Sequence, residues 1–195
     1  MDCRVKPLNP DTKLLGPAYT VKMVGLDSGP LHYAISHAPK GSVLVIDHHD
    51  APEYAPIGEF VSLNLQLRGF SGVVIDGCVT DSKAIRQSSF PVFCTGVSAV
   101  VTKMLANSGA VNLPVSCCGT VVNPGDIIFA DCDGVLVLPQ DAIEEPLKKA
   151  EQGMAREQMI REKLETATAS GKPVDINQIF PANPDYLEKL KYYDD

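Results

Sequence analysis

Short apolar runs, bounded by glycine, proline or aspartate, alternate with polar segments along most of this chain. Their length of four to six residues and their content of β-branched side chains predict strands. The predicted strands are residues 19–24, 42–47, 72–76, 91–94, 119–122, 126–130 and 134–139.

One helix is predicted between the second and third of these strands. Phe60, Leu63 and Leu67 recur at spacings of three and four residues, which is the period of one helix face. Gly69 follows as a typical C-terminal stop. We therefore expect a helix whose apolar face carries these three side chains.

A second helix is predicted over residues 82–87, with Asp81 as its N-cap. Residues 42–94 then alternate strand, helix, strand, helix and strand. This order indicates a parallel sheet with right-handed crossovers.

The chain changes character after residue 113. Turn signals at 123–126 and 131–134 separate short apolar runs, which indicates an antiparallel meander. Asp141 and Glu144 then form a capping-box pattern, which predicts a long amphipathic helix that ends near Thr168. A proline-rich tail follows from residue 171.

Residues 97–107 are ambiguous from their local pattern. Their apolar positions fit one face of a helix, and helix is what propensity favours, although the β-branched side chains also suit an extended segment.

Length and charge exclude several classes of protein. With 195 residues we expect a single α/β domain over residues 1–170 and a tail over 171–195.

The formal net charge of −7 opposes binding to nucleic acid, whose phosphate backbone requires a basic surface. No apolar run reaches the roughly 18 residues of a membrane span, and the polar N-terminus does not resemble a signal peptide. We expect a cytoplasmic protein without a membrane partner.

Six cysteines are present, and none of them forms a C-x-x-C pair. Most lie inside apolar runs, where free thiols pack as small hydrophobic groups. The sequence therefore predicts buried thiols, with no zinc site. The six are Cys3, Cys78, Cys94, Cys117, Cys118 and Cys132.

Two acidic residues stand at joints between predicted elements, where functional side chains are often found. Glu59 lies at a helix N-terminus, and Asp81 is the last residue of the GVVIDGCVTD segment. The free amides of residues 58–61 would attract a carboxylate or a phosphate. The alternative is structural, since acids are common in first helical turns and at N-caps.

The order of several sequence blocks resembles the RraA-like family. These blocks are GPAYTV, GSVLVID, GEFVSLNLQLRGFSGVVIDGCVTD, FPVF and PVSCCGTVVNPGDIIFADCDGVLVLP, and the resemblance covers roughly residues 15–165. The family includes the regulator of ribonuclease E activity and the class II 4-hydroxy-4-methyl-2-oxoglutarate aldolases. It implies a swivelling β/β/α domain, in which a central barrel-like sheet is flanked by helices, and an irregular extended passage at 97–107.

The same resemblance implies a metal-dependent site. Family aldolases carry an acidic residue, then twenty residues, then Arg-Asp; Glu59 is followed here by twenty residues and then Thr80-Asp81. In the family, the residue that matches Asp81 anchors a magnesium or manganese ion. The residue that matches Glu59 orients a water for proton transfer. Gly58, Phe60 and Val61 correspond to the amides that hold the carboxylate of the substrate.

Thr80 is the departure from the family pattern, because the aldolases have an arginine that contacts the 2-keto acid and stabilises enolate charge. Lys83 and Arg86 are candidates to replace it. The resemblance implies a lyase, of the aldolase or decarboxylase type, that acts on a small 2-keto acid through a metal-stabilised enolate. Two alternatives stay open: a non-catalytic regulatory module that binds a protein, or an enzyme with altered chemistry on the same scaffold.

Family members form ring-shaped trimers, some of them stacked as hexamers, with the site between adjacent subunits. We expect a homotrimer or a hexamer here, in which Glu157 or Glu162 of a neighbour reaches the metal's waters. Of the four histidines, His48 and His49 are adjacent, and their side chains should point apart, which opposes a joint metal site. The sequence favours a loop role for this pair, and the alternative is that one of the two borders the site as a proton-transfer group.

Overall fold

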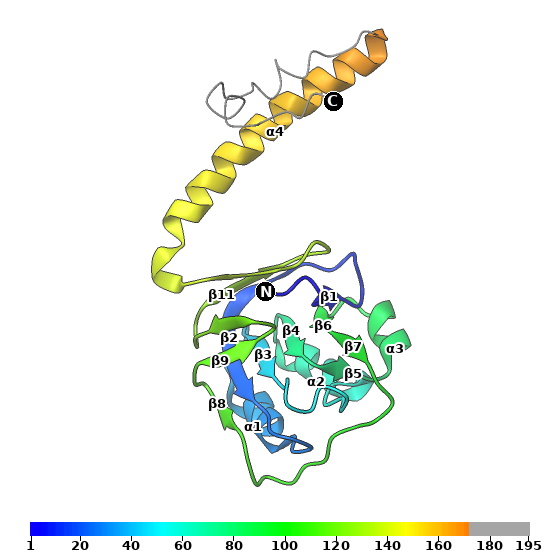
Figure 1. Cartoon of the computed structure of the whole chain (residues 1–195), viewed down its shortest axis with the longest axis vertical. Coiled ribbons are helices and arrows are strands. Elements are labelled where there is room, and N and C mark those ends of the chain that lie inside the picture. Colours follow the sequence, from blue (N-terminus) through cyan, green and yellow to red (C-terminus); the bar gives the residue numbers. More distant parts are fainter. Residues whose placement is uncertain (172–195) are drawn as a thin grey trace, which may run out of the picture. The chain divides into compact units, whose positions relative to one another are not determined.

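The computed structural model describes residues 1–171 (Figure 1). Met1–Ala142 form one compact unit, and a second unit begins at Ile143 and contains helix α4 (Glu144–Ser170). Residues 172–195, which include nearly all of the predicted tail, lie outside the described residues. The predicted domain boundary at residue 170 therefore stays a prediction.

Four parallel strands form the centre of the first unit. They are β2 (Leu14–Lys22), β3 (Val43–Asp47), β4 (Gly72–Asp76) and β6 (Val92–Cys94), which lie side by side in chain order. The short strand β1 (Lys6–Pro7) adds to β6 in the antiparallel sense. The parallel sheet predicted for residues 42–94 is confirmed, and β2 extends it by one strand.

Antiparallel strands complete the sheet on the other side of β2. The first half of β2 pairs with β11 (Ile127–Ala130), which in turn pairs with β12 (Val135–Leu138). A second hairpin joins β9 (Val115–Cys117) to β10 (Thr120–Val122), and β8 (Ala110–Val111) pairs with the end of β2. The predicted antiparallel strands are found, but as two separate hairpins rather than one meander, because β11 pairs with β2 and not with β10. The main sheet curls into a half-barrel (Figure 1).

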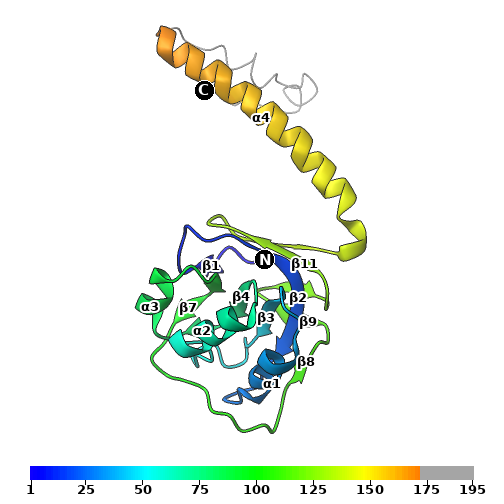
Figure 2. The same cartoon turned by 180° about the vertical axis from the view of Figure 1, so that it is seen from behind.

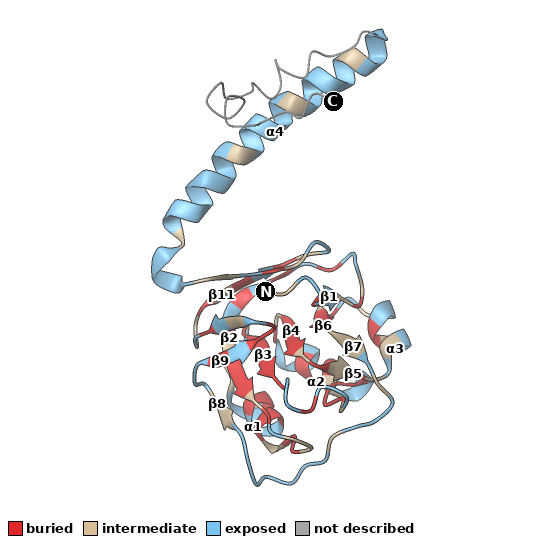
Figure 3. Ribbon diagram, viewed as in Figure 1, coloured by how far each residue is buried: buried red, intermediate tan, exposed pale blue. Residues whose placement is uncertain are grey.

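The two faces of the sheet are covered by different layers because side chains alternate along each strand. Leu44 and Ile46 of β3 pack in one hydrophobic cluster with α1 (Gly29–His37), α2 (Glu59–Arg68) and α3 (Ser82–Gln87). Val43 and Val45 pack in a second cluster with β9 to β12. Figure 2 shows α2 lying over the sheet, and Figure 3 shows the buried strands between the layers.

Helix α2 has the predicted boundaries. It ends at Arg68, and Gly69 adopts the left-handed conformation with φ 84°. The apolar side chains that identify this helix in the sequence are not its buried ones: Phe60 and Leu67 are 80% and 87% exposed, while Ser62 and Leu65 are buried. The apolar spacing of three and four residues follows the outer side of the helix, so that periodicity alone selects the wrong face.

The start of α4 also differs from the sequence prediction. Asp141 lies in a 3₁₀ turn (Gln140–Ala142), Ile143 occupies the N-cap position, and no side chain caps the helix. The predicted capping box is therefore wrong, while the helix itself is confirmed and ends at Ser170. None of residues 144–170 is buried (Figure 3). None of the helices that the structure describes has the length and apolar character to cross a membrane.

Residues 97–107 do not form a helix. After the short strand β7 (Gly96–Val97), which pairs with β5 (Cys78–Val79), the chain runs through isolated bridges at Val101 and Lys103. The local helix propensity was misleading here, and the extended passage implied by the family is confirmed. Helix α1 has no counterpart in the prediction from sequence.

The orientation of α2 can be tested by a pair of matched substitutions. Leu65→Ala removes a fully buried side chain and should lower the free energy of unfolding by about 2–5 kcal/mol. Leu67→Ala removes a mostly exposed one and, at a protein concentration at which the chain is monomeric, should change it by less than about 0.5 kcal/mol. Urea unfolding followed by circular dichroism measures both. Equal effects would contradict the described orientation.

Candidate functional site

A hollow of about 280 Å³ lies where four separate segments of the first unit meet. The segments are the start of α1, the approach to α2, the turn between β5 and α3, and the extended passage after β7. Its lining residues are Ser28, His32, Ala55, Pro56, Gly58, Phe60, Val61, Thr80, Asp81, Val101, Thr102 and Met104. Five of the predicted site residues, Gly58, Phe60, Val61, Thr80 and Asp81, therefore share one hollow.

Asp81 connects two of these segments. Its Oδ2 atom accepts a hydrogen bond from the backbone N–H of Glu59 at 3.0 Å, across 22 positions of sequence. Asp81 holds the N-cap position of α3, but its side chain makes no cap bond there and its backbone is left-handed, with φ 51°. The prediction that Asp81 caps α3 is wrong, because its carboxylate is directed to the N-terminus of α2.

Gly58 allows this close approach. A Cβ atom at Gly58 would lie 2.6 Å from Asp81 Oδ2 and 2.8 Å from Thr80 Cγ2, so a larger residue would displace both side chains. Gly58 also accepts hydrogen bonds at its carbonyl from the N–H and hydroxyl of Ser62, which fix the first turn of α2.

The first turn of α2 presents polar backbone groups at the hollow. The hydrogen bonds of the described residues include no acceptor for the N–H groups of Phe60 and Val61. Such free amides, together with the helix dipole, favour a bound anion. Because Glu59 N–H is already bonded to Asp81, Phe60 and Val61 are the amides that remain for a ligand.

Glu59 does not line the hollow that contains Asp81 and Thr80. It lines a smaller hollow of about 50 Å³ with residues of α2 and α3. The structure thus brings the backbone N–H of Glu59 to Asp81, while Glu59 is not among the residues that line the larger hollow. Its role in proton transfer stays a prediction.

Neither basic residue of α3 lies in the hollow with Thr80. The guanidinium of Arg86 donates to the carbonyl of Leu8 at 3.0 Å. Lys83 lines a separate, open depression on the other side of Asp81. In this chain, Thr80 therefore occupies the position of the family arginine, and neither basic residue of α3 replaces the guanidinium in the hollow.

The wall opposite α2 is formed by residues 98–108, which we call the strap. The strap is fixed to the first turn of α1 by Asp27, which is only 2% exposed. The Asp27 carboxylate accepts hydrogen bonds from five backbone N–H groups at 2.6–3.0 Å. The donors are Gly29, Leu105, Ala106, Asn107 and Ser108.

These N–H groups determine the charge state of Asp27. Burial by itself would raise the pKa of Asp27, but the backbone N–H groups around the carboxylate outweigh this effect and hold its pKa well below 3.8. Gly29 is also required there, since a Cβ atom would lie 2.8 Å from the Cα of Ala106. Asp27 is therefore an ionised anchor of the strap at neutral pH.

His48 and His49 follow the end of β3 and lie outside the helices and strands, as the favoured loop role predicts. His48 is fully buried and its Nε2–H donates to the carbonyl of Gly25, while His49 is exposed and its Nδ1–H donates to Asp47. Their side chains point apart, as predicted, but neither lines the hollow with Asp81. The histidine that does line it is His32 of α1.

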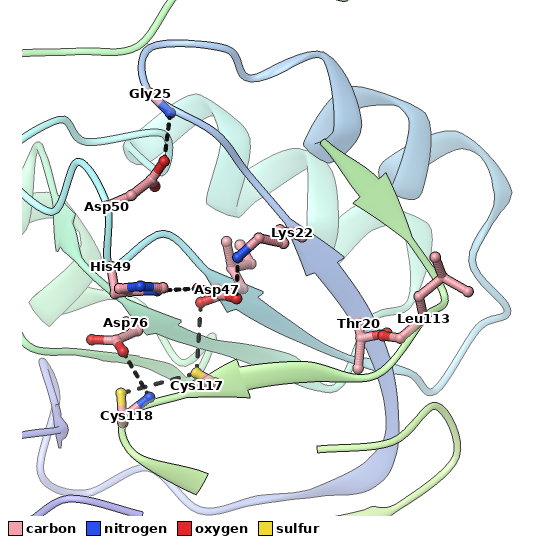
Figure 4. A network of polar contacts seen from close by, with 11 residues as sticks. Thr20, Lys22, Gly25, Asp47, His49, Asp50, Asp76, Leu113, Cys117 and Cys118 are labelled. Carbon is pink, nitrogen blue, oxygen red and sulfur yellow. Dashed lines mark hydrogen bonds and ion pairs between the residues drawn. The ribbon is translucent and has the colours of Figure 1, made fainter. Parts of the chain in front are cut away.

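A polar network occupies the carboxyl ends of β2, β3 and β4 (Figure 4). Asp47 is buried and accepts hydrogen bonds from Lys22 at 2.8 Å and His49 at 2.7 Å. Burial would raise the pKa of Asp47, but these two donors hold it below its usual value. Asp47 is thus satisfied within the fold.

Cysteines complete this network. The N–H of Cys118 donates to Asp76, and Cys117 approaches both Cys118 and the carbonyl of Ile46 (Figure 4). The contact with Cys118 and burial raise the pKa of Cys117 well above its usual value, and burial raises that of Cys94 to about 11. All six cysteines are free. Cys94, Cys117 and Cys118 are buried thiols as predicted, but the prediction is wrong for the exposed Cys3 and Cys132, and Cys78 is half-buried.

Asp81 fits the role of a single carboxylate ligand to a hard cation. One of its oxygens is oriented by Glu59 N–H, and no hydrogen bond among the described residues involves the other. Magnesium commonly takes one or two protein carboxylates and keeps several waters. In the part of the chain that the structure describes, three side chains close enough together to share a cation occur at the turn Asp131–Asp133, which does not line this hollow.

Sequence reasoning missed the residues that complete the site. Asp27, His32 and Met104 reach the hollow or its wall from segments far from residues 58–81. The Asp-Ser-Gly-Pro run at 27–30 signals a turn before a helix, but it does not reveal a partner nearly 80 positions away.

Comparisons with known proteins agree with this fold. The model of the family described as "RraA-like: Aldolase/RraA" matches residues 1–137. The chain is 36% identical over 151 residues to the Halalkalibacterium halodurans protein named "Putative 4-hydroxy-4-methyl-2-oxoglutarate aldolase", covering 77% of this chain and 71% of that protein. It is 39% identical over 163 residues to the uncharacterized protein MJ0644 of Methanocaldococcus jannaschii, with 82% and 77% covered.

One solved structure has a similar fold. The crystal structure of Streptomyces coelicolor RraAS2, described as an unusual member of the RNase ES inhibitor RraA protein family, superimposes with a TM-score of 0.71 at 25% identity. The superposition covers 80% of each chain.

The anchor function of Asp27 predicts a pH-dependent effect. Asp27→Asn should lower the melting temperature by several degrees, because an amide cannot accept five hydrogen bonds as an ionised carboxylate does. A carboxylate with a lowered pKa stabilises the fold above its unfolded pKa, and this contribution is lost as the pH falls through the folded value. The difference in melting temperature between the wild type and Asp27→Asn should therefore be constant from neutral pH to about pH 5. It should shrink below pH 3.8.

Differential scanning fluorimetry at a series of pH values measures this deficit. Asp50→Asn is the matched control, because Asp50 is exposed and accepts one backbone hydrogen bond, from Gly25. A deficit that grows on acidification would contradict the assignment.

Proposed function

This chain belongs to the RraA-like family, and from that premise we propose that it is a metal-dependent lyase that cleaves a small 2-oxo acid. The observation that carries the proposal is the placement of Asp81. Its carboxylate lies beside the N-terminus of α2, in a hollow lined by the residues that match the family's substrate-binding positions. The aldolase name of a relative with 36% identity supports the same reaction class.

The N-terminus of α2 would bind the carboxylate of the substrate. The N–H groups of Phe60 and Val61 are donors without an acceptor among the described residues, and Thr80, which has a hydroxyl that can donate, lines the same hollow. Backbone donors held by a helix need no rearrangement on binding. They would place the 2-oxo group next to Asp81.

The proposed reaction is a retro-aldol cleavage of a 4-hydroxy-2-oxo acid. The C4 hydroxyl loses its proton, the C3–C4 bond breaks, and its electron pair passes into the 2-oxo group to give the enolate of pyruvate. Protonation of C3 then gives pyruvate, and C4 leaves as an aldehyde or a ketone. Glu59 and His32 are the candidates to transfer these protons. Glu59 is the first residue of α2, next to the amides that would bind the carboxylate, and His32 lines the hollow.

Asp81 would hold a magnesium or manganese ion, which when bound supplies positive charge for the developing enolate. Thr80 cannot supply this charge, since a hydroxyl is neutral where the family has a guanidinium. Asp81 would therefore carry a larger share of the catalysis here than in the arginine-bearing relatives.

A regulatory, protein-binding function is the second candidate, and Thr80 is the observation that favours it. Losing a donor that stabilises charge in the transition state commonly costs on the order of a hundredfold in rate. The structural relative from Streptomyces coelicolor is described as a member of an inhibitor family.

We also propose that copies of this chain associate through the outer face of α2, in a trimer or a hexamer. This face consists of Phe60, Leu63 and Leu67, which are exposed although apolar. Contiguous exposed apolar side chains typically mark an interface.

The lyase proposal predicts pyruvate release from oxaloacetate or 4-hydroxy-4-methyl-2-oxoglutarate when Mg²⁺ or Mn²⁺ is added. Asp81→Ala should lower the rate by about a hundredfold or more, because the metal and substrate lose their anchor. Thr80→Arg should raise it about tenfold or more by restoring a fixed cation. A coupled lactate dehydrogenase assay measures both rates.

Asp131→Ala is the control for these variants, because this residue lies at the Asp131–Asp133 turn and does not line the hollow. If the wild type is inert and Thr80→Arg becomes active, the natural protein catalyses a different reaction. If both are inert, the lyase proposal fails and the regulatory function becomes the better interpretation.

The proposed association predicts that Leu67→Glu lowers the mass in solution about threefold, because a charge would be buried at each interface of a ring. Light scattering coupled to gel filtration measures the mass. Leu136→Glu, at an exposed position of β12, should leave it unchanged. A wild-type protein of monomer mass would contradict the proposal.

A further inference from the structure

Helix α4 is exposed along its whole length (Figure 3). It has 27 residues, and none of them is buried. In proteins, most of the stability of a helix comes from the packing of its apolar face against another element. The exposure of α4 therefore indicates a partner that residues 1–171 of the same chain do not supply.

One stripe of α4 has the spacing of a coiled-coil seam. Seven residues follow one another at alternating intervals of three and four, which places them on one side of the helix. They are Leu147, Ala150, Met154, Glu157, Arg161, Leu164 and Thr168. The three large apolar side chains of this stripe, Leu147, Met154 and Leu164, are 58%, 69% and 41% exposed. Such a stripe is typically covered by a second helix.

Two charged residues, Glu157 and Arg161, lie at the centre of the stripe. The ion pairs of the described residues include Lys149 with Glu145 on α4, but none of them involves Glu157 or Arg161. Burying either charge without an opposite one would be strongly unfavourable. The helix that covers the stripe must therefore carry an acid and a base at matching positions.

A second copy of α4 meets this requirement when the two helices are antiparallel. With a two-fold axis at the level of Met159, Glu157 of each copy lies opposite Arg161 of the other. The same axis places Met154 of each copy opposite Leu164 of the other, so that apolar side chains also meet. A parallel pair would instead place Glu157 against Glu157 and Arg161 against Arg161, which is unfavourable.

We propose that α4 forms an antiparallel coiled coil with α4 of a second copy of this chain. Its centre consists of two ion pairs, each between Glu157 of one copy and Arg161 of the other. The pairing is independent of the lyase proposal and of the association through α2. A two-fold contact joins copies in twos, so together with a ring of three it gives a hexamer. In this pair Glu157 is an interface residue, which leaves Glu162 as the acid expected to reach a neighbour's metal.

The mass of the full chain in solution, measured by light scattering coupled to gel filtration, tests the pairing. Arg161→Glu places acids at both central positions of each helix and should halve the mass relative to the wild type, because like charges then meet. Lys163→Glu is the matched control, since it makes the same change of charge two positions away, outside the stripe, and should leave the mass unchanged. A wild-type protein of monomer mass, or an unchanged mass in Arg161→Glu, would overturn the proposal.

An exchange of charges separates lost pairing from lost helix. Glu157→Arg should also halve the mass. An equimolar mixture of Arg161→Glu and Glu157→Arg should return to the wild-type mass, because the acidic stripe of one variant then meets the basic stripe of the other. A mixture that keeps the halved mass would overturn the proposal and favour another occupant of the stripe, either residues 172–195 of the same chain or a different protein.

Disulfide formation reports the orientation of the pair. The exposed Cys3 and Cys132 are first replaced by serine. A mixture of Met154→Cys and Leu164→Cys should then cross-link on oxidation with copper phenanthroline in air, because these positions lie opposite each other. Met154→Cys alone should not cross-link, since the two copies of residue 154 lie about 15 Å apart along an antiparallel pair. Efficient cross-linking of Met154→Cys alone would indicate parallel helices and overturn the antiparallel pairing.

Discussion

The wall of the candidate site depends on one buried carboxylate. Asp27 gathers four successive backbone N–H groups of the strap and one from α1, and no side chain of opposite charge takes part in these bonds. Leaving buried backbone N–H groups without a hydrogen-bond acceptor would cost free energy. The strap is short and, in the described part of the chain, has no neighbouring strand along residues 105–108 to supply acceptors, so the Asp27 carboxylate supplies them. The hollow, its apolar wall and the position of Met104 all follow from this anchor.

Much of the fold could be predicted because its local signals agree with its tertiary structure. The strands at 43–47 and 72–76 are apolar on both faces, as expected of central parallel strands that are covered by helices on one side and strands on the other. The orientation of α2 could not be predicted, because its exposed side is as apolar as its buried side. Spacing identifies a helix but not the face that the rest of the chain covers.

The site was only partly accessible from the sequence. Glu59 and Asp81 could be singled out by their places at the ends of elements, and the family pattern selected the same pair. The contact between them depends on the absence of a Cβ at Gly58, and the strap reaches the hollow from more than twenty residues farther along the chain. Such contacts between distant segments are set by the assembled sheet, and no local pattern encodes them.

The backbone of Asp81 is left-handed, a conformation that glycine adopts more readily than any residue with a side chain. Replacement by glycine would therefore relieve backbone strain and at the same time remove the carboxylate. Position 81 is thus one where thermal stability and chemistry are opposed. Selection for stability alone would favour losing the acid, so a screen for heat-resistant variants of this protein would be expected to enrich inactive ones at this position.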